Sequence, residues 1–226
     1  MKPGNRALIA LLLLVPAPTV GTAAALWLLP GPVGQAIYGF CKIWLLGFPL
    51  VWLHFVERKP WSWSPPRQGG LLMGLLLGLL MGTIILTGYW LLDSKRINLP
   101  QVRQLALRNG FGTKISFLGL ALYLTLVNSL LEEYVWRWFV FRRTEEALGS
   151  WSAVLLAAAF FTIHHTVALS IQFGWTITLL GSLGVLISGL IWSGCYLRYR
   201  SVWPGYLSHI LADAAIFLVG WRILFG

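Results

Sequence analysis

One set of seven ionisable residues lies inside the long apolar stretches of this sequence, where a charged side chain costs free energy. They are three acids, three histidines and one arginine: Glu132, Glu133, Asp213, His164, His165, His209 and Arg137. A charged side chain at the centre of a bilayer costs at least roughly 2.5 kcal/mol even on the lenient insertion scale. Because carboxylates and imidazoles can transfer protons or coordinate a metal ion, this set is the main functional clue.

The spacing of these residues places several side chains on common helix faces. Glu133 and Arg137 are four residues apart with the acid first, which is the favourable order for an ion pair, and we interpret this pair as structural. Glu132 lies about 100° further round the helix and can point elsewhere. His209 and Asp213 are also four residues apart, so an imidazole and a carboxyl group converge in the last apolar stretch. Three helices thus present polar groups that could meet in one buried site.

Structural roles compete with chemical roles at the remaining positions. Asp213 either orients His209 through a hydrogen bond or takes a direct part in chemistry. His164 and His165 are adjacent, so their side chains point apart and at least one is expected to face the interior of a helix bundle.

The elements that must position these residues are membrane-spanning helices. Of 226 residues, 58% are hydrophobic and 11% are charged, whereas a soluble protein carries roughly 25% charge, so a soluble enzyme is excluded. Uncharged runs of about 20 residues rich in Leu, Ala and Gly favour helices over the alternating strands of a barrel. We therefore predict an all-α polytopic fold of about seven (six to eight) transmembrane helices. The predicted spans are 7–29, 33–55, 71–92, 115–141, 152–170, 176–197 and 203–224.

Basic residues dominate the segments between the spans. Seventeen basic residues against seven acidic ones give a net charge of +10, and their placement fits an anionic membrane face rather than a nucleic acid. Lys2, Arg6 and the apolar run after them resemble a signal peptide, but the run continues to Pro30, which favours a retained first helix. Residues 97–113 mix polar and spaced apolar positions, which predicts an interfacial amphipathic helix.

Three motifs together resemble one family. The segment 131–138 (LEEYVWRW) resembles the EExxxR motif of the CAAX protease and bacteriocin-processing family, whose members include relatives of the CAAX prenyl endopeptidases. The segment 159–165 (AFFTIHH) resembles its FxxxH motif, and 187–215 is similar to its closing segment with HxxxN or HxxxD. We expect transmembrane helices and an interfacial segment over 1–114, and a catalytic core over 115–226 with a buried polar site among the C-terminal four helices.

What this resemblance implies is an intramembrane endopeptidase that hydrolyses a peptide bond of a membrane-anchored protein or peptide. In the family, the first glutamate, here Glu132, and the FxxxH histidine activate a water molecule. That motif fits both His164 and His165, with a slight preference for His165. The later pair, here His209 and Asp213, steadies the oxyanion. Asp213 stands where many members carry Asn, so it must be protonated, orient His209 or bind a positive group.

The resemblance to the prenyl endopeptidases favours a metal-free glutamic mechanism without a cofactor. A zinc peptidase is the alternative, with Glu132, His165, His209 and Asp213 as ligands, although the HExxH motif is absent. A non-catalytic bacteriocin-immunity or binding protein of the same fold is a second hypothesis, and a proton-coupled transporter is a third. The short chain suggests a prokaryotic plasma membrane, which makes a prenylated substrate less expected.

Overall fold

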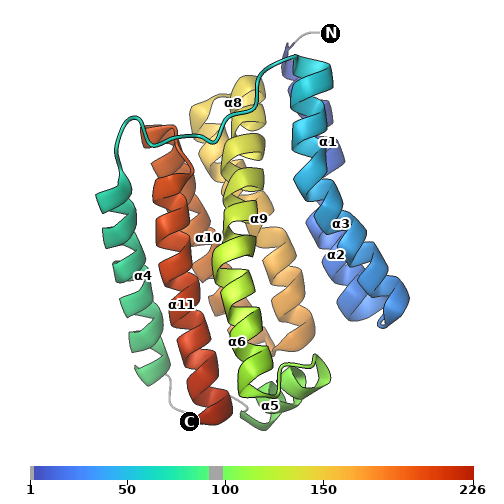
Figure 1. Ribbon diagram of the computed structural model, residues 1–226, viewed down its shortest axis with the longest axis vertical. Helices are drawn as coiled ribbons and strands as arrows, with labels where there is room; N and C mark the ends of the chain where they lie inside the picture. Colours follow the sequence, from blue (N-terminus) through green and yellow to red (C-terminus); the bar gives the residue numbers. More distant parts are fainter. Residues whose placement is uncertain (1–2, 92–98) are drawn as a thin grey trace. The chain divides into compact units, whose positions relative to one another are not determined.

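The structure is a computed structural model that describes residues 3–91 and 99–226, and within these ranges it contains helices and no β-strand (Figure 1). Seven helical stretches in the described ranges are long and apolar enough to cross a membrane: Gly4–Leu28, Pro32–Glu57, Leu71–Leu91, Lys114–Leu148, Ser150–Gln172, Trp175–Tyr199 and Trp203–Phe225. Each overlaps one predicted span, so the all-α polytopic fold is confirmed. Residue 92, the predicted end of the third span, lies outside the described residues.

The chain folds as two compact units that alternate along the sequence. Unit 1 comprises Met1–Pro65 and Glu133–Val202, and unit 2 comprises Pro66–Glu132 and Trp203–Gly226. The boundary between the units falls between the two neighbouring glutamates of the EExxxR motif. The expected division into an N-terminal part and a catalytic core at residue 114 stays a prediction.

Unit 1 is a helix bundle, and two of its helices begin with a proline. Proline stands at the first turn of both α2 and α3, where its missing N–H costs no helical hydrogen bond. An added methyl group at Gly189 of α10 would lie 3.2 Å from the Cα of Ala158 in α9, so these two backbones approach closely. The helices, with π-helical stretches written η, are α1 (Pro3–Leu14), α2 (Pro16–Ala23), η1 (Ala24–Leu28), α3 (Pro32–Val51), η2 (Trp52–Glu57), η5 (Glu133–Phe141), α8 (Arg142–Leu148), α9 (Ser150–Gln172) and α10 (Trp175–Tyr199).

Unit 2 is built around the packing of α4 (Leu71–Leu91) against α11 (Trp203–Phe225), which run side by side (Figure 1). Gly74, Gly78 and Gly82 recur every four residues on the face of α4 that meets α11. A methyl group at Gly74 would lie 2.3 Å from the carbonyl oxygen of Pro204, so only glycine permits this approach. Unit 2 also contains α5 (Leu99–Arg108), α6 (Lys114–Leu122), η4 (Tyr123–Asn128) and α7 (Ser129–Glu132).

The predicted amphipathic segment at 97–113 contains the separate helix α5, and residues 97–98 lie outside the described residues. Arg103 of α5 donates a hydrogen bond from Nε to the carbonyl of Ile223 at 3.3 Å, which ties α5 to α11. A capping box between Thr113 and Ser116 then starts α6. The helix is therefore confirmed, and its place at the membrane interface stays a prediction.

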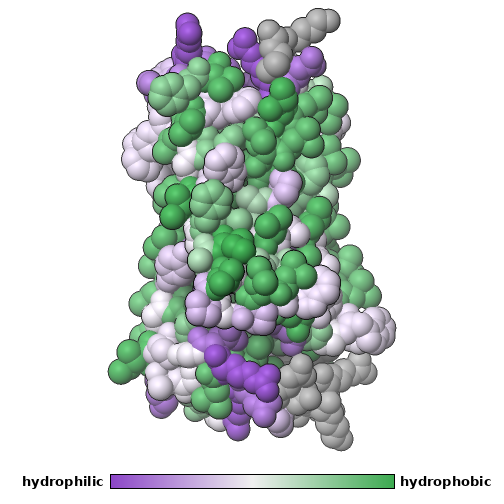
Figure 2. Space-filling view, turned by 90° about the vertical axis from the view of Figure 1, so that its right-hand side faces the viewer, coloured by the Kyte–Doolittle hydropathy of each residue, from purple (hydrophilic) through white to green (hydrophobic). Residues whose placement is uncertain are grey.

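Apolar side chains cover most of the visible surface (Figure 2). Leu72, Ile115 and Trp175 are examples of large apolar side chains that are more than two-thirds exposed. Soluble monomers rarely expose continuous apolar patches larger than a few hundred Å². With seven apolar spans, the chain is an integral multi-pass membrane protein.

Candidate active site

The predicted pair of Glu133 and Arg137 is present in unit 1 and fully buried. Arg137 Nη1 lies 3.0 Å from Glu133 Oε1, and both side chains are 0% exposed. The guanidinium also lies over the rings of Phe161 and Trp192, at 4.7 and 5.1 Å from their centroids. Two cation–π contacts and an ion pair thus tie η5 to α9 and α10. An acid already neutralised in this way suits a structural role.

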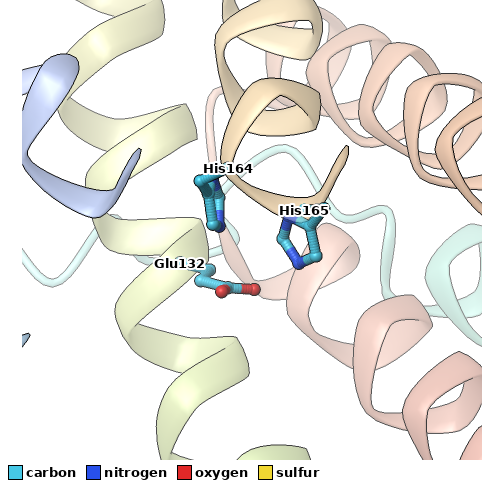
Figure 3. Close-up of side chains that lie close together, drawn as sticks. All are labelled: Glu132, His164 and His165. Atoms are coloured by element: carbon cyan, nitrogen blue, oxygen red, sulfur yellow. The ribbon is translucent and has the colours of Figure 1, made fainter. Parts of the chain in front are cut away.

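The adjacent histidines of α9, which Figure 3 draws, make different contacts within unit 1. The Nδ1 of His165 lies 3.0 Å from the carbonyl oxygen of Phe161, which can only accept, so Nδ1–H donates and Nε2 is the acceptor nitrogen. The ring of His164 instead stacks on Trp136, with centroids 5.6 Å apart and planes at 9°. A backbone carbonyl therefore fixes the tautomer of His165, which suits a base, while His164 packs against an aromatic ring.

Unit 2 brings Glu132, His209 and Asp213 together. His209 Nε2 lies 3.6 Å from Glu132 Oε2 and 3.8 Å from Asp213 Oδ2. Glu132 is 8% exposed and His209 is 4% exposed. A single imidazole nitrogen thus faces two carboxyl groups at distances just beyond direct hydrogen bonding. In unliganded sites such bonds are often long and tighten when substrate binds.

The close helix packing of unit 2 determines where His209 stands. An added methyl group at Gly78 of α4 would lie 2.9 Å from the Cα of Ser208, the residue before His209. The Ser208 side chain is fully buried, and its Oγ lies 3.5 Å from the Sδ of Met81 in α4. The glycines of α4 therefore hold this turn of α11 in place. Glu132, whose carboxyl group is drawn in Figure 3, is the last residue of α7.

Sequence analysis missed Ser129, which lies in α7 three residues before Glu132. The Ser129 side chain is 0% exposed, and its Oγ lies 2.6 Å from Asp213 Oδ2 and 2.9 Å from the Leu124 carbonyl oxygen. The spacing of three residues, which places Ser129 and Glu132 on similar faces of a helix, was the available signal. A serine in an apolar stretch costs much less free energy than a charged residue. Its presence in the sequence therefore does not indicate a functional site by itself.

Sequence analysis also missed an ionic cluster in unit 1. Arg143 is 1% exposed, and its Nη1 lies 2.9 Å from Glu57 Oε1 and 2.8 Å from Glu146 Oε2. Lys59 Nζ lies 3.5 and 3.6 Å from the same two acids. This cluster ties η2 to α8 and contains no histidine, so it suits an anchor of the fold rather than a reaction centre.

The predicted site residues are thus distributed over both units. Unit 1 holds the Glu133–Arg137 pair with His164 and His165 around Phe161. Unit 2 holds Glu132 with His209 and Asp213. The catalytic roles assigned to these residues from the sequence stay predictions.

Comparison with known proteins concerns the second half of the chain. Residues 114–215, which include all seven ionisable residues above, match the model of a family described as type II CAAX prenyl endopeptidase Rce1-like. No curated protein and no solved structure matches the chain with significance. The family match confirms the resemblance predicted from the three motifs. The proteins of that family are membrane proteases that act on membrane-anchored substrates.

Proposed function

We propose that this chain, whose residues 114–215 match the Rce1-like family, is an intramembrane endopeptidase of the glutamic type. Its substrate is a peptide bond of a membrane-anchored protein or peptide, and its nucleophile is a water molecule activated by Glu132 and a histidine. The observation that carries this proposal is the placement of Glu132 Oε2 at 3.6 Å from His209 Nε2 in a nearly buried site. Water-excluded carboxyl and imidazole groups suit acid–base chemistry at a peptide bond.

The proposed reaction has two proton transfers. Glu132 takes a proton from the water as its oxygen attacks the carbonyl carbon, and the carbonyl oxygen becomes an oxyanion. The Nε2–H of His209 donates to that oxyanion, a contribution worth several kcal/mol in comparable sites. The proton held by Glu132 then passes to the amide nitrogen as the carbon–nitrogen bond breaks. The products are a carboxylic acid and an amine, so the atoms balance.

His165 is the proposed partner of Glu132, in preference to His164. Its Nδ1–H is held by the Phe161 carbonyl, which leaves Nε2 to accept a hydrogen bond from the water and so to orient it while Glu132 takes the proton. The resemblance to the family supports this pairing, because there the first glutamate and the FxxxH histidine activate the water together.

The alternative zinc mechanism uses Glu132, His165, His209 and Asp213 as ligands. Carboxylate and imidazole are suitable zinc ligands, so the chemistry of the donors fits both mechanisms. We propose the metal-free mechanism, in which Glu132 itself takes the proton of the water. The remaining proposals are a prokaryotic plasma membrane as the location and a substrate anchored in that membrane.

Cleavage of membrane-anchored reporters by the purified protein in liposomes tests this function. Glu132→Ala and His209→Ala are the variants, and Thr144→Val is the matched control. Thr144 is fully buried, and its hydroxyl bonds only to the Val140 carbonyl in the described structure, at 2.9 Å. We expect cleavage by wild type and the control, none by the two variants, and full activity with a strong chelator.

The other outcomes contradict parts of this proposal. Loss of activity on chelation with recovery on adding zinc would contradict the metal-free mechanism. Absence of cleavage by folded wild-type protein would favour an immunity or binding function. Downhill flux of a solute coupled to protons, without cleavage, would favour a transporter.

A further inference from the structure

A pocket lies at the end of the second membrane-spanning stretch in unit 1, and none of its residues takes part in the proposed reaction. Its volume is about 510 Å³, and it is lined by His54, Phe55, Arg58, Lys59 and Pro60. That volume is within the roughly 300–1,000 Å³ of typical small-molecule sites. The lining side chains include two cations and an imidazole but no acid, so the pocket suits an anion.

The charge of Arg58 is not used elsewhere in unit 1. Each of the four acidic side chains of this unit lies 3.0 Å or less from a different basic residue. The pairs are Glu57–Arg143, Glu133–Arg137, Glu145–Arg200 and Glu146–Arg143. The Arg58 side chain is exposed, and in the part of the chain that the structure describes it makes no hydrogen bond or ion pair. Its positive charge is therefore available to a bound ligand.

The backbone at Arg58 also points to a role for this side chain. Arg58 follows the π-helical stretch η2 and has a left-handed backbone, with φ at 54°. Glycine is the usual residue at such a helix end, because a side chain is disfavoured in this conformation. The backbone N–H groups of Arg58 and Lys59 both donate to the Leu53 carbonyl oxygen, so the backbone itself closes the helix. A side chain that the turn does not need, kept in a strained conformation, indicates a function.

The chain that follows the pocket is held in place within unit 1. The Ser201 hydroxyl donates to the Ser64 carbonyl oxygen at 2.6 Å, and the Val202 N–H donates to the Ser64 hydroxyl at 3.2 Å. Pro60 lies between this anchored serine and Arg58, and its ring restricts the backbone. Because the walls of the pocket are fixed before binding, a ligand loses less of its binding free energy to ordering the protein.

Apolar side chains beside the basic groups indicate which kind of anion fits. Phe55, which lines the pocket, is 70% exposed, and Val51, one turn earlier in the same span, is 54% exposed. Trp61 and Trp63 follow the pocket with ring centroids 3.9 Å apart, and Trp63 is 68% exposed. Exposed tryptophans at the end of a span are typical of the membrane–water interface. A ligand that meets both walls has a negative head and apolar chains.

We propose that this pocket binds the headgroup of an anionic phospholipid. The phosphate lies beside Arg58 and Lys59, and the acyl chains run along Phe55 into the bilayer. Basic pockets next to membrane-spanning helices recognise anionic headgroups in this way. A free phosphate would meet only the basic wall, so the exposed Phe55 favours the lipid. The binding does not depend on whether the chain cleaves peptides.

Native mass spectrometry of the full chain in detergent micelles, titrated with phosphatidylglycerol, tests the proposal. We expect wild type to bind one phosphatidylglycerol more tightly than phosphatidylcholine, whose headgroup has no net charge. Arg58→Gln should raise the Kd for phosphatidylglycerol about fivefold or more, since one basic side chain contributes roughly 1 kcal/mol at an anionic membrane surface. Arg198→Gln is the matched control, because it removes the same charge from an exposed arginine of α10 outside the pocket. We expect it to raise the Kd less than about twofold.

A second variant separates loss of the ligand from loss of the fold. Arg58→Gly removes the side chain and places the preferred residue in the left-handed conformation. We expect this variant to weaken phosphatidylglycerol binding as much as Arg58→Gln does, with an unchanged or higher melting temperature. Wild-type affinity in folded Arg58→Gly would overturn the proposal.

Three further results would also overturn it. They are equal affinity of wild type for the two lipids, equal effects of Arg58→Gln and Arg198→Gln, and displacement of phosphatidylglycerol by inorganic phosphate at the same concentration. The second would show attraction by overall charge rather than by the pocket, and the third would assign the pocket to a free phosphate. Because no reporter is cleaved in these measurements, failure of this proposal is distinct from failure of the proposed function.

Discussion

Glu132 and Glu133 are neighbours in the chain, yet they have opposite electrostatic surroundings. Glu133 is 0% exposed and lies 3.0 Å from an arginine that is itself packed on two aromatic rings. Glu132 is 8% exposed and lies near the imidazole of His209, a group whose ring nitrogens can donate or accept a proton. A permanent counter-charge makes the first acid a structural group, whereas a titratable neighbour makes the second acid suitable for catalysis.

The largest expected effect is on cleavage by Glu132→Gln, because the amide keeps the shape of the side chain but cannot take a proton. We expect a loss of about 10³-fold or more in kcat. The free energy of unfolding should stay near the wild-type value, because the neighbouring His209 imidazole, unlike an arginine, has no permanent charge. Reporter cleavage and thermal unfolding measure the two quantities. An unfolded Glu132→Gln protein would contradict the difference between the two acids.

Glu133→Gln should instead act on stability. The substitution leaves the fully buried Arg137 without its counter-charge, which typically costs about 3–5 kcal/mol. Replacing both partners together, as Glu133→Leu with Arg137→Met, should recover much of that loss, because two apolar side chains need no counter-charge. Denaturant titration in detergent gives the free energies. Equal stability of Glu133→Gln and wild type would show that the pair has no structural role.

The two histidines offer the next comparison. We expect His165→Ala to lower kcat about 10²-fold, because it removes the nitrogen oriented by the Phe161 carbonyl. His164→Ala should retain most activity and lose about 1 kcal/mol of stability with its stacking on Trp136. Cleavage kinetics and thermal unfolding, measured in parallel for both variants, distinguish the two roles. The reverse pattern would make His164, and not His165, the histidine that works with Glu132.

Disturbing the packing of α4 against α11 should destabilise the protein less than breaking the buried ion pair does. We expect Gly74→Ala to destabilise unit 2 by about 1–3 kcal/mol, because the new methyl group would meet the Pro204 carbonyl oxygen. Gly88→Ala in the same helix is the matched control, since nothing lies within 4 Å of its added methyl group. Alanine is the better helix former by about 1 kcal/mol, so this variant should be neutral or stabilised. Equal effects at both sites would contradict the close approach.

The smallest loss of stability is expected at an exposed ion pair of unit 1. Its comparison with the buried pair Glu133–Arg137 measures how much burial contributes. Arg200 lies 2.6 Å from Glu145 with 44% of its side chain exposed, and this hydrogen-bonded carboxylate raises the pKa of Arg200. Exposed pairs contribute about 0.2–1 kcal/mol, so Glu145→Gln should cost no more than that. The loss should shrink in high salt. A cost comparable to that of Glu133→Gln would contradict the role we give to burial.

Much of the fold can be predicted from the sequence, because a run of about 20 uncharged, mostly apolar residues is enough to predict a membrane span. The pairing of Glu133 with Arg137 and the approach of His209 to Asp213 also follow, since both depend only on a spacing of four residues. The contact between Ser129 and Asp213 does not follow, because it joins distant parts of the chain through a π-helical turn that propensities do not predict. The glycines of α4 are visible in the sequence, but their partner helix is known only from the structure.

The central claim is that one acid of the adjacent pair catalyses and the other supports the fold. The most direct test is the cleavage rate per folded molecule, measured in parallel for Glu132→Gln and Glu133→Gln in the same liposomes. We predict that Glu132→Gln is folded and inactive, whereas Glu133→Gln yields less folded protein that still cleaves the reporter. Wild-type cleavage by folded Glu132→Gln would contradict the account.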